Sequence, residues 1–215
     1  MASPGCRIAS VQITSSVRFF DTQFERQVRE GDFALNPFEA AALPYLHGRV
    51  LDFGCGLGNL ALAAARRGCS VVALDASRAA VDHLRRVASA NALPIEASEA
   101  DLRAYELTED FDTVVSIGLL MFFDCPSAYR QLAHLQSRVR PGGIAVVNVL
   151  VEGTTYLDMF DTQGHCLFSR DELHARFAGW KVLYSECRDF DAPSERIKSF
   201  ATLIAQKPLA AHGAT

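Results

Sequence analysis

The stretch Val50-Leu51-Asp52-Phe53-Gly54-Cys55-Gly56-Leu57-Gly58-Asn59-Leu60 decides the fold. An apolar run ends in an acid, passes through three closely spaced glycines and enters an alanine-rich segment, 61–67. This pattern predicts a buried strand, a tight turn and a helix start, the place where α/β sheets bind nucleotide-like ligands. Glycines let a ligand lie against the backbone, and the helix start offers unpaired N–H groups. The alternative is a turn that is merely tight.

A second acid strengthens the interpretation as a ligand site. Residues 70–74 predict the next strand, and Asp75 follows it about twenty residues after the first glycine. In a right-handed βαβ unit this strand lies beside the first, so we expect Asp75 to face the same crevice and to accept hydrogen bonds from ribose hydroxyls. The alternative role of Asp75 is to help start the helix that Ser77 opens.

Composition limits the class of protein. The chain has 215 residues, 49% of them hydrophobic, which is enough for the core of one domain. A net charge of −4 and the lack of a basic run argue against nucleic-acid binding. No apolar run reaches the length of a membrane span, and residues 1–18 lack the apolar core of a signal peptide. We therefore expect no membrane contact and a cytoplasmic protein.

The cysteines are scattered and show no Cys-x-x-Cys spacing. This distribution favours reduced thiols over disulfides or a zinc site, and no metal is expected. The six residues are Cys6, Cys55, Cys69, Cys125, Cys166 and Cys187.

Strand and helix patterns alternate along the middle of the chain. Such alternation predicts an α/β fold with a parallel, doubly wound sheet. The predicted segments are a helix over 77–90, a strand over 94–97, a strand over 111–117, a helix over 126–139, a turn over 140–143 and a strand over 144–150. After a polar loop (152–167) and a helix capped by Ser169, strands over 180–187 and 197–205 follow without a helix between them, which predicts an antiparallel hairpin at one edge.

The ends of the chain are predicted to differ from this core. Phe20, Phe24 and Val28 form one apolar stripe of a short helix, and Asn36-Pro37 opens a second helix. We therefore expect a flexible N-terminus (1–18), a single domain (19–207) made of a helical cap (19–47) and a sheet core (48–207), and a flexible tail (208–215).

Several short motifs follow one another along the chain: Asp52-x-Gly54-x-Gly56-x-Gly58, Asp75, Asp101-Leu102, Phe111-Asp112 and Pro141-Gly142-Gly143. From Pro37 to Lys207 the chain thereby resembles the class I S-adenosylmethionine-dependent methyltransferases. The resemblance implies a Rossmann-like sheet of seven strands in the order 3-2-1-4-5-7-6, with the last strand antiparallel.

The same resemblance implies S-adenosylmethionine as cofactor and assigns its contacts. Gly54 and Gly56 would pass close to the methionine part, and Asp52 would help hold its amino group. Asp75, with Ala76 beside it, would take the ribose hydroxyls. The other expected contacts are Asp101 and the backbone N–H of Leu102 to adenine, and Ser116 and Ile117 on the sulfonium side. Asn59 stands where a pyrophosphate-binding turn would carry its third glycine, which makes a diphosphate ligand less suitable.

Segments outside the core resemble the tellurite-resistance (TehB-like) type of methyltransferase. They are residues 20–28, 31–39, 168–173, 179–180 and 196–205. This resemblance implies a small-molecule methyl acceptor with a soft nucleophile, such as a chalcogen oxyanion or a thiol. The family carries a His-Arg pair in the loop before its final strand, whereas residues 189–195 contain no histidine. The resemblance therefore implies the general class rather than tellurite itself.

Methyl transfer is an in-line displacement, so the main task is to align the reacting atoms. A general base is needed only if the nucleophile carries a proton. The candidates are Tyr156, Asp158, Asp161 and His165; His165 is the only histidine in that loop, and simple solvation is its alternative role. We expect a monomer or homodimer. Two other functions stay open at this point, a non-catalytic S-adenosylmethionine-binding regulatory module and, less favoured, an NAD-dependent oxidoreductase.

Overall fold

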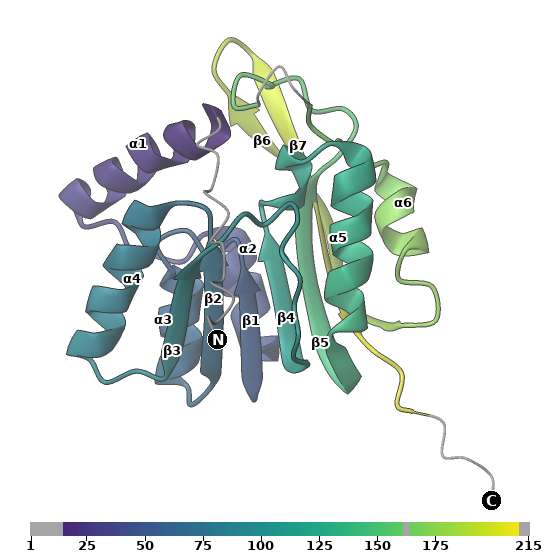
Figure 1. Ribbon diagram of the computed structural model, residues 1–215. Helices are drawn as coiled ribbons and strands as arrows, with labels where there is room; N and C mark the ends of the chain where they lie inside the picture. Colours follow the sequence, from purple (N-terminus) through teal and green to yellow (C-terminus); the bar gives the residue numbers. More distant parts are fainter. Residues whose placement is uncertain (1–14, 161–163, 211–215) are drawn as a thin grey trace, which may run out of the picture.

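The protein is an α/β structure built on one seven-stranded sheet (Figure 1). The computed structural model describes residues 15–160 and 164–210. The sheet order is β3-β2-β1-β4-β5-β7-β6, and β7 runs antiparallel to both of its neighbours. This confirms the predicted class and strand order. The strands are β1 (Arg49–Phe53), β2 (Ser70–Asp75), β3 (Ile95–Glu99), β4 (Phe111–Ile117), β5 (Val139–Leu150), β6 (Lys181–Ala192) and β7 (Arg196–Gln206).

The helices begin at polar caps that the sequence supplies. Asn36 caps α2 with a full capping box, and Ser77, Asp124 and Ser169 cap α4, α5 and α6. The α-helices are α1 (Ser15–Glu30), α2 (Pro37–Ala42), α3 (Asn59–Arg66), α4 (Arg78–Ala90), α5 (Cys125–Ser137) and α6 (Arg170–Ala175); short 3₁₀ turns are η1 (Leu43–Tyr45) and η2 (Leu120–Phe122). The first helix thus starts at Ser15, and residues 1–14 of the expected flexible N-terminus lie outside the described residues.

The two faces of the sheet bury separate apolar clusters. Side chains of α5 and α6, such as Leu132 and Leu173, pack on one face with Phe53 and Phe111. Helices α3 and α4 pack on the other face, where Leu84 joins the second cluster. Near-continuous burial of β1 and β4 follows, because a parallel strand covered on both faces has no solvent-facing side.

The register places the carboxyl ends of the central strands side by side. Phe53 at the end of β1 pairs with Leu74 near the end of β2. The N–H groups of Gly54 and Cys55 then donate to the carbonyl of Leu74, at 2.8 and 3.1 Å. The glycine turn is therefore attached to the neighbouring strand and has a fixed position.

The segment Arg140–Gly143 is part of a strand rather than the predicted turn into one. β5 begins at Val139, which pairs with Phe111, and the register of the β4–β5 ladder shifts between Phe111 and Thr113. The irregularity absorbs Pro141, which has no N–H for the ladder. Gly142 still donates a hydrogen bond to the carbonyl of Lys207 (3.0 Å).

The expectation of reduced thiols throughout is wrong, because Cys125 and Cys166 form a disulfide. It joins the first turn of α5 to the loop that follows β5. The two cysteines lie 41 residues apart, so no local spacing marks them as a pair. Cys55 and Cys69 are free and buried, Cys187 is free and exposed, and Cys6 lies outside the described residues.

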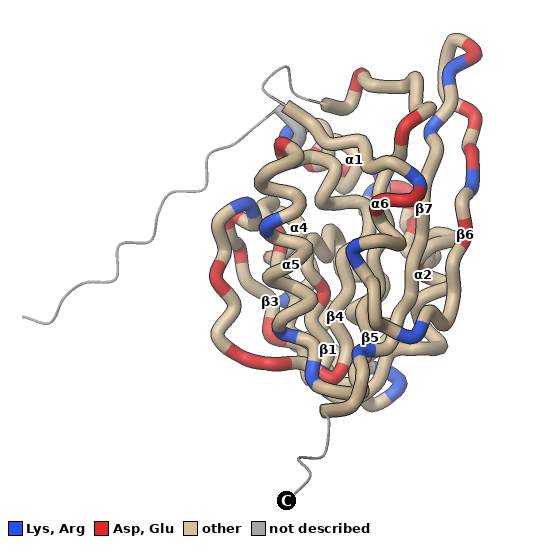
Figure 2. The backbone as a smooth tube through the Cα atoms, turned by 90° about the vertical axis from the view of Figure 1, so that its right-hand side faces the viewer, with Lys and Arg blue, Asp and Glu red and all other residues tan. Residues whose placement is uncertain are grey.

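The edge strand β6 is protected by charge. Figure 2 shows acidic and basic residues along this strand, whose hydrogen-bonding edge would otherwise be open to other chains. Within residues 15–160 and 164–210, no helix is long and apolar enough to cross a membrane. The same residues include no cluster of three or more side chains that could hold a metal ion.

Candidate active site

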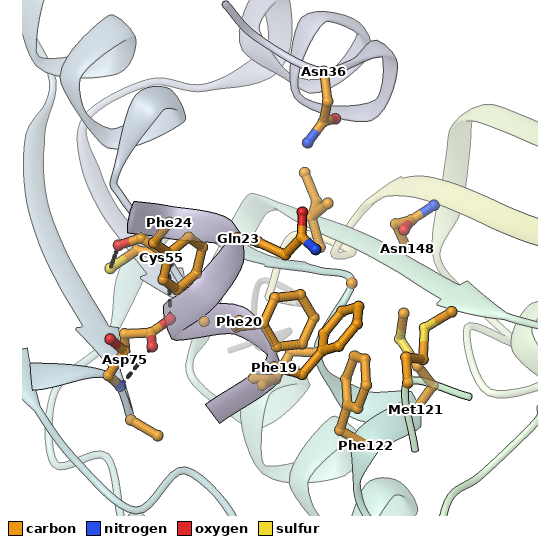
Figure 3. A pocket seen from close by; sticks show the side chains of 18 of the residues that line it. Phe19, Phe20, Gln23, Phe24, Asn36, Cys55, Asp75, Met121, Phe122 and Asn148 are labelled. Carbon is orange, nitrogen blue, oxygen red and sulfur yellow. Dashed lines mark hydrogen bonds between the residues drawn. The ribbon is translucent and has the colours of Figure 1, made fainter. Parts of the chain in front are cut away.

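A cavity of about 740 Å³ opens at the carboxyl ends of the central strands (Figure 3). Its walls come from the glycine turn after β1, from the ends of β2 and β4, from α1 and from the loop after β5. This is the volume range of pockets that hold drug-sized ligands. The motif residues that the sequence singled out and a set of aromatic residues therefore share one space.

The glycine turn requires left-handed backbone. Gly54, Gly56 and Gly58 have φ angles of +91°, +52° and +78°. At Gly56 an added Cβ would also lie 3.1 Å from the ring of Phe24. The turn thus holds its shape only with glycine, and it brings main-chain atoms to the cavity surface.

Asp52 is a buried acid, only 5% exposed, that lines the cavity. Burial, followed by the nearby charges of Glu39 and Asp75, raises the pKa of Asp52 to about 8. Its Oδ2 atom has no hydrogen-bond partner among the described residues. Glu39 lines the cavity too; burial raises its pKa, and its Oε2 accepts the N–H of Asn36 at 2.8 Å.

Asp75 lines the cavity and also braces the backbone around it. Its Oδ2 accepts the N–H of Gly56 and its Oδ1 accepts the N–H of Ser77, both at 2.8 Å. Burial raises the pKa of Asp75, and these hydrogen bonds partly offset the effect. Each oxygen keeps a free lone pair, so the structural role and a ligand role are compatible.

The residues expected around adenine line the cavity on the β3 side. Asp101 and Leu102 are there, with Arg103, whose guanidinium is 3.6 Å from the Asp101 carboxylate. Asn59 and Ala76 line the cavity as well, and the buried Oδ1 atom of the half-buried Asn59 has no partner among the described residues.

The structure separates the two residues expected at the end of β4. Ile117 lines the cavity. Ser116 is 1% exposed and is not among the lining residues, because successive residues of a strand point to opposite faces. Asn148, the register partner of Ile117 on β5, lines the cavity in addition.

The chemistry of this end suits S-adenosylmethionine. Its sulfonium and ammonium are cations, and the lining side chains of this end include four acids: Glu39, Asp52, Asp75 and Asp101. Buried acceptors without partners, Asp52 Oδ2 and Asn59 Oδ1, await a donor from a ligand. Ammonium and ribose hydroxyl groups are such donors, so the residues present fit the group.

The opposite end of the cavity is aromatic and thioether-rich. In Figure 3, Phe19 and Phe20 of α1 face Phe122 and Met121 of η2. The rings of Phe20 and Phe122 meet edge to face, with centroids 5.1 Å apart. Met121 and Met159 belong to a small apolar cluster against which Phe19 and Phe122 pack. This wall differs in kind from the acidic end.

The candidates for a general base lie in different settings. Tyr156 lines the cavity, whereas Asp158 is exposed and forms a two-pronged ion pair with Arg196 at 2.6 and 2.7 Å. The ring of His165 stacks on Phe160, with centroids 4.5 Å apart, and is not among the lining residues. Asp161 lies outside the described residues.

Glu39, Asn148 and Lys198 are among the polar lining residues that sequence reasoning missed. Glu39 had a detectable sign, the capping box Asn36-Pro37-Phe38-Glu39 that fixes it at the start of α2. Asn148 and Lys198 stand in strand patterns, and only the sheet register reveals which face they take.

Helix α1 closes the cavity from above the glycine turn. Phe24 contacts the turn at Gly56, and Asp21 accepts a hydrogen bond from the Ser77 hydroxyl at the start of α4. The same helix contributes Phe19 and Phe20 to the aromatic end. One helix therefore covers both ends of the site.

Comparisons with known proteins agree with this geometry. Residues 50–143 match the family model of a methyltransferase domain. The chain is 33% identical over 170 residues to Hemagglutinin 1 of Eikenella corrodens and 26% identical over 166 residues to the probable S-adenosyl-L-methionine-dependent methyltransferase TehB of Haemophilus influenzae. Each alignment covers 74% of this chain, and 55% and 57% of the respective relative, so the chain spans little more than half their length.

Two solved structures share the fold. The crystal structure of TehB from Haemophilus influenzae superposes with a TM-score of 0.72 at 19% identity, covering 84% of this chain and 65% of that one. A structure described by the conversion of a disulfide bond into a thioacetal group during echinomycin biosynthesis gives 0.61 at 27% identity, covering 83% and 85%. With its matched segment, strand order and fitting cavity, the chain carries a class I S-adenosylmethionine-dependent methyltransferase domain similar to that of TehB.

Proposed function

We propose that the protein transfers a methyl group from S-adenosylmethionine to a small molecule that presents a soft nucleophile, a thiol or a chalcogen oxyanion. The observation that carries the proposal is the single cavity in which an acidic, glycine-rich end adjoins an aromatic, thioether-lined end. When bound, the cofactor supplies a methyl carbon on a sulfonium; a bond from the nucleophile forms as the carbon–sulfur bond breaks and leaves a neutral thioether.

The chain's own residues would bind and orient. Asp52, with Glu39 close enough to perturb it, would hold the cofactor ammonium, and Asp75 would hold the ribose. Asp101 and the backbone of Leu102 would hold adenine. Phe20 and Phe122 would exclude water and leave the nucleophile poorly solvated, which favours soft, weakly hydrated nucleophiles.

A general base is not essential to this proposal. A thiol with an ordinary pKa is partly ionised near pH 8, and oxyanions already carry charge. Tyr156 is the lining group from the candidate loop, whereas His165 would need the loop to rearrange before it reached an acceptor. Relatives support the same chemistry, since the echinomycin structure concerns sulfur and TehB bears a methyltransferase name.

Two measurements test the proposal. Isothermal titration should show binding of S-adenosylhomocysteine, and labelled methyl should pass from S-adenosylmethionine to members of a panel of thiols, selenite and tellurite. Binding without turnover of any acceptor would favour the regulatory-module alternative. Binding of NAD and not of S-adenosylhomocysteine would overturn the proposal.

A further inference from the structure

Lys198 is the basic residue of the cavity with no ion pair among the described residues. Two basic residues line the cavity, and the other, Arg103, pairs with Asp101 at 3.6 Å. Lys198 lies on β7, partly buried, with its amine 4.7 Å from the centre of the Tyr156 ring. Burial lowers the pKa of this amine. The cation is therefore partly desolvated, and no carboxylate of the described chain pairs with it.

The alternation of side chains along β7 places Lys198 on the face of the sheet that lines the aromatic end of the cavity. Lys198 and Phe200 are two residues apart on β7, so they share one face of the sheet, and both line the cavity. Phe38 packs on Phe200, with ring centroids 4.8 Å apart. Lys198 thus stands beside an apolar wall, on the β7 side of the cavity.

Arg196, a neighbouring cation, differs from Lys198 because it has a carboxylate partner. Arg196 also lies over the Tyr156 ring, at 4.7 Å, but the carboxylate of Asp158 holds its guanidinium with two hydrogen bonds. The chain neutralises Arg196 and leaves Lys198 for a ligand. An anion there would gain a charge-assisted hydrogen bond to a partly desolvated amine, and partial desolvation strengthens such bonds.

The walls around this cation favour a ligand with an apolar body. Phe19, Phe20, Phe122, Met121, Met159 and Phe200 are all lining residues. A small inorganic oxyanion would leave these side chains uncovered and would give up its own hydration. A ring compound would bury apolar surface worth about 25 cal/mol per Å² against the same walls.

We propose that the methyl acceptor is an aryl thiol that also carries a carboxylate: its thiolate sulfur takes the methyl group, its ring packs against the wall that Phe20 and Phe122 form, and its carboxylate pairs with Lys198. The inference rests on the proposed function, because it assigns the second substrate of the same site. Lys198 acts in it by binding, and no proton leaves the lysine in the reaction.

Matched compounds test the pairing. The 2-, 3- and 4-mercaptobenzoates and their carboxamides carry the same aryl thiol and differ in one charge. Titrated into protein saturated with S-adenosylhomocysteine, at least one carboxylate should bind about tenfold or more tightly than its carboxamide. With S-adenosylmethionine, the same pair should show that preference in kcat/KM.

Variants assign the preference to Lys198. Lys198→Met should bring the carboxylate-to-carboxamide ratio to about one, whereas Lys198→Arg, which keeps a cation but is a poor base, should retain most of it. Lys181→Met, at an exposed lysine of β6, is the matched control and should leave the ratio unchanged. Affinity for S-adenosylhomocysteine should stay within about twofold in all three, since Lys198 is assigned to the acceptor alone.

Three results would overturn the inference: no carboxylate bound better than its carboxamide, a preference that survives Lys198→Met, or selenite or tellurite bound more tightly than every aryl compound. Failure of the proposed function is separate, because it appears as absent S-adenosylhomocysteine binding. In that case the carboxylates and carboxamides are titrated into protein without S-adenosylhomocysteine, and the same three results would overturn the assignment of Lys198.

Discussion

The two ends of the cavity are built by the chain in different ways. At the acidic end, Asp52 and the glycine turn come from one short stretch, and Asp75 follows on the adjacent strand. At the aromatic end, Phe20, Phe122, Met159 and Lys198 come from α1, η2, the loop after β5 and β7. A contiguous motif is fixed by backbone geometry, whereas a wall assembled from four segments depends on how those segments pack. The ends should therefore respond separately to mutation.

Removal of the disulfide is expected to have the largest effect, and to affect the aromatic end of the cavity rather than the acidic end. Replacing Cys125 and Cys166 together by serine opens a loop whose ends are 41 residues apart, and should lower the free energy of unfolding by about 2–4 kcal/mol. The link ties down the loop that carries Tyr156 and Met159, so acceptor binding should weaken while S-adenosylhomocysteine affinity holds. Urea denaturation of oxidised, reduced and doubly substituted protein measures the first effect. Cys187→Ser, at a free exposed thiol, is the control, and an equal loss there would contradict the account.

A substitution at Asp75 is expected to affect the acidic end of the cavity instead. Asp75→Ala should weaken S-adenosylhomocysteine binding by about 1–3 kcal/mol, because charge-assisted bonds to the ligand are lost. The same change frees the N–H groups of Gly56 and Ser77, so thermal stability should also fall. Titration calorimetry and a melting curve report the two effects, with exposed Asp82→Ala of α4 as control. Full ligand affinity in Asp75→Ala would show that Asp75 has only its structural role.

Asp52 should give the acidic end a pH dependence. In the unfolded chain this acid loses its proton near its ordinary pKa of about 4, whereas the folded protein without ligand holds it up to about pH 8. The folded state binds more protons between these values, so the free energy of unfolding falls as pH rises through that window. Asp52→Asn removes the titrating group and with it this fall, so the variant should be more stable than the ligand-free wild type at pH 8 by about 1–2 kcal/mol.

The same acid predicts proton release on cofactor binding. An ammonium beside Asp52 favours the carboxylate, so S-adenosylhomocysteine should bind more tightly at pH 8 than at pH 6, and Asp52→Asn should bind it more weakly with little pH dependence. Calorimetry in buffers of different ionisation enthalpy counts the protons. Uptake rather than release would show that Asp52 does not meet the ammonium.

The smallest effect is expected at the exposed pair of Asp158 and Arg196. Asp158→Asn should leave the melting temperature unchanged, since surface ion pairs contribute little. It also frees Arg196 as a second cation near Tyr156, and mercaptobenzoate should then bind about twofold more tightly at low salt. A salt titration with the carboxamide as reference measures this gain. If Asp158→Asn bound mercaptobenzoate more weakly, the carboxylate of the ligand would not lie near Lys198 and Tyr156.

Local patterns were enough to predict most of the fold. The strand over 111–117 and the cap at Asn36 were predicted at the residues where they occur, because periodicity and capping act within a few residues. The turn predicted at Arg140–Gly143 was wrong, because Pro and Gly punctuate most sequences, whereas here a ladder irregularity beside Phe111 takes up the proline. That irregularity depends on how β5 pairs with β4, and a short stretch of sequence around Pro141 carries no information about this pairing.

The site was less predictable than the fold, for a related reason. Acids and glycines at strand ends could be placed from their position in the βαβ unit. The orientation of Ser116, away from the cavity, and of Asn148, toward it, follows from register and strand parity that the sequence left open. The Cys125–Cys166 pair likewise depends on how the loop after β5 returns to α5.

The cover formed by α1 has a kinetic consequence. Because Phe24 lies against the glycine turn and Phe20 against Phe122, we expect both the cofactor product and the methylated acceptor to leave past this helix. Among the described residues, the helix is held by the hydrogen bond between Asp21 and Ser77 and by these ring contacts. Turnover would then be paced by the opening of α1 rather than by methyl transfer, as in enzymes whose product release is limiting. A pre-steady-state burst of one methylated product per active site would be the signature of that order of events.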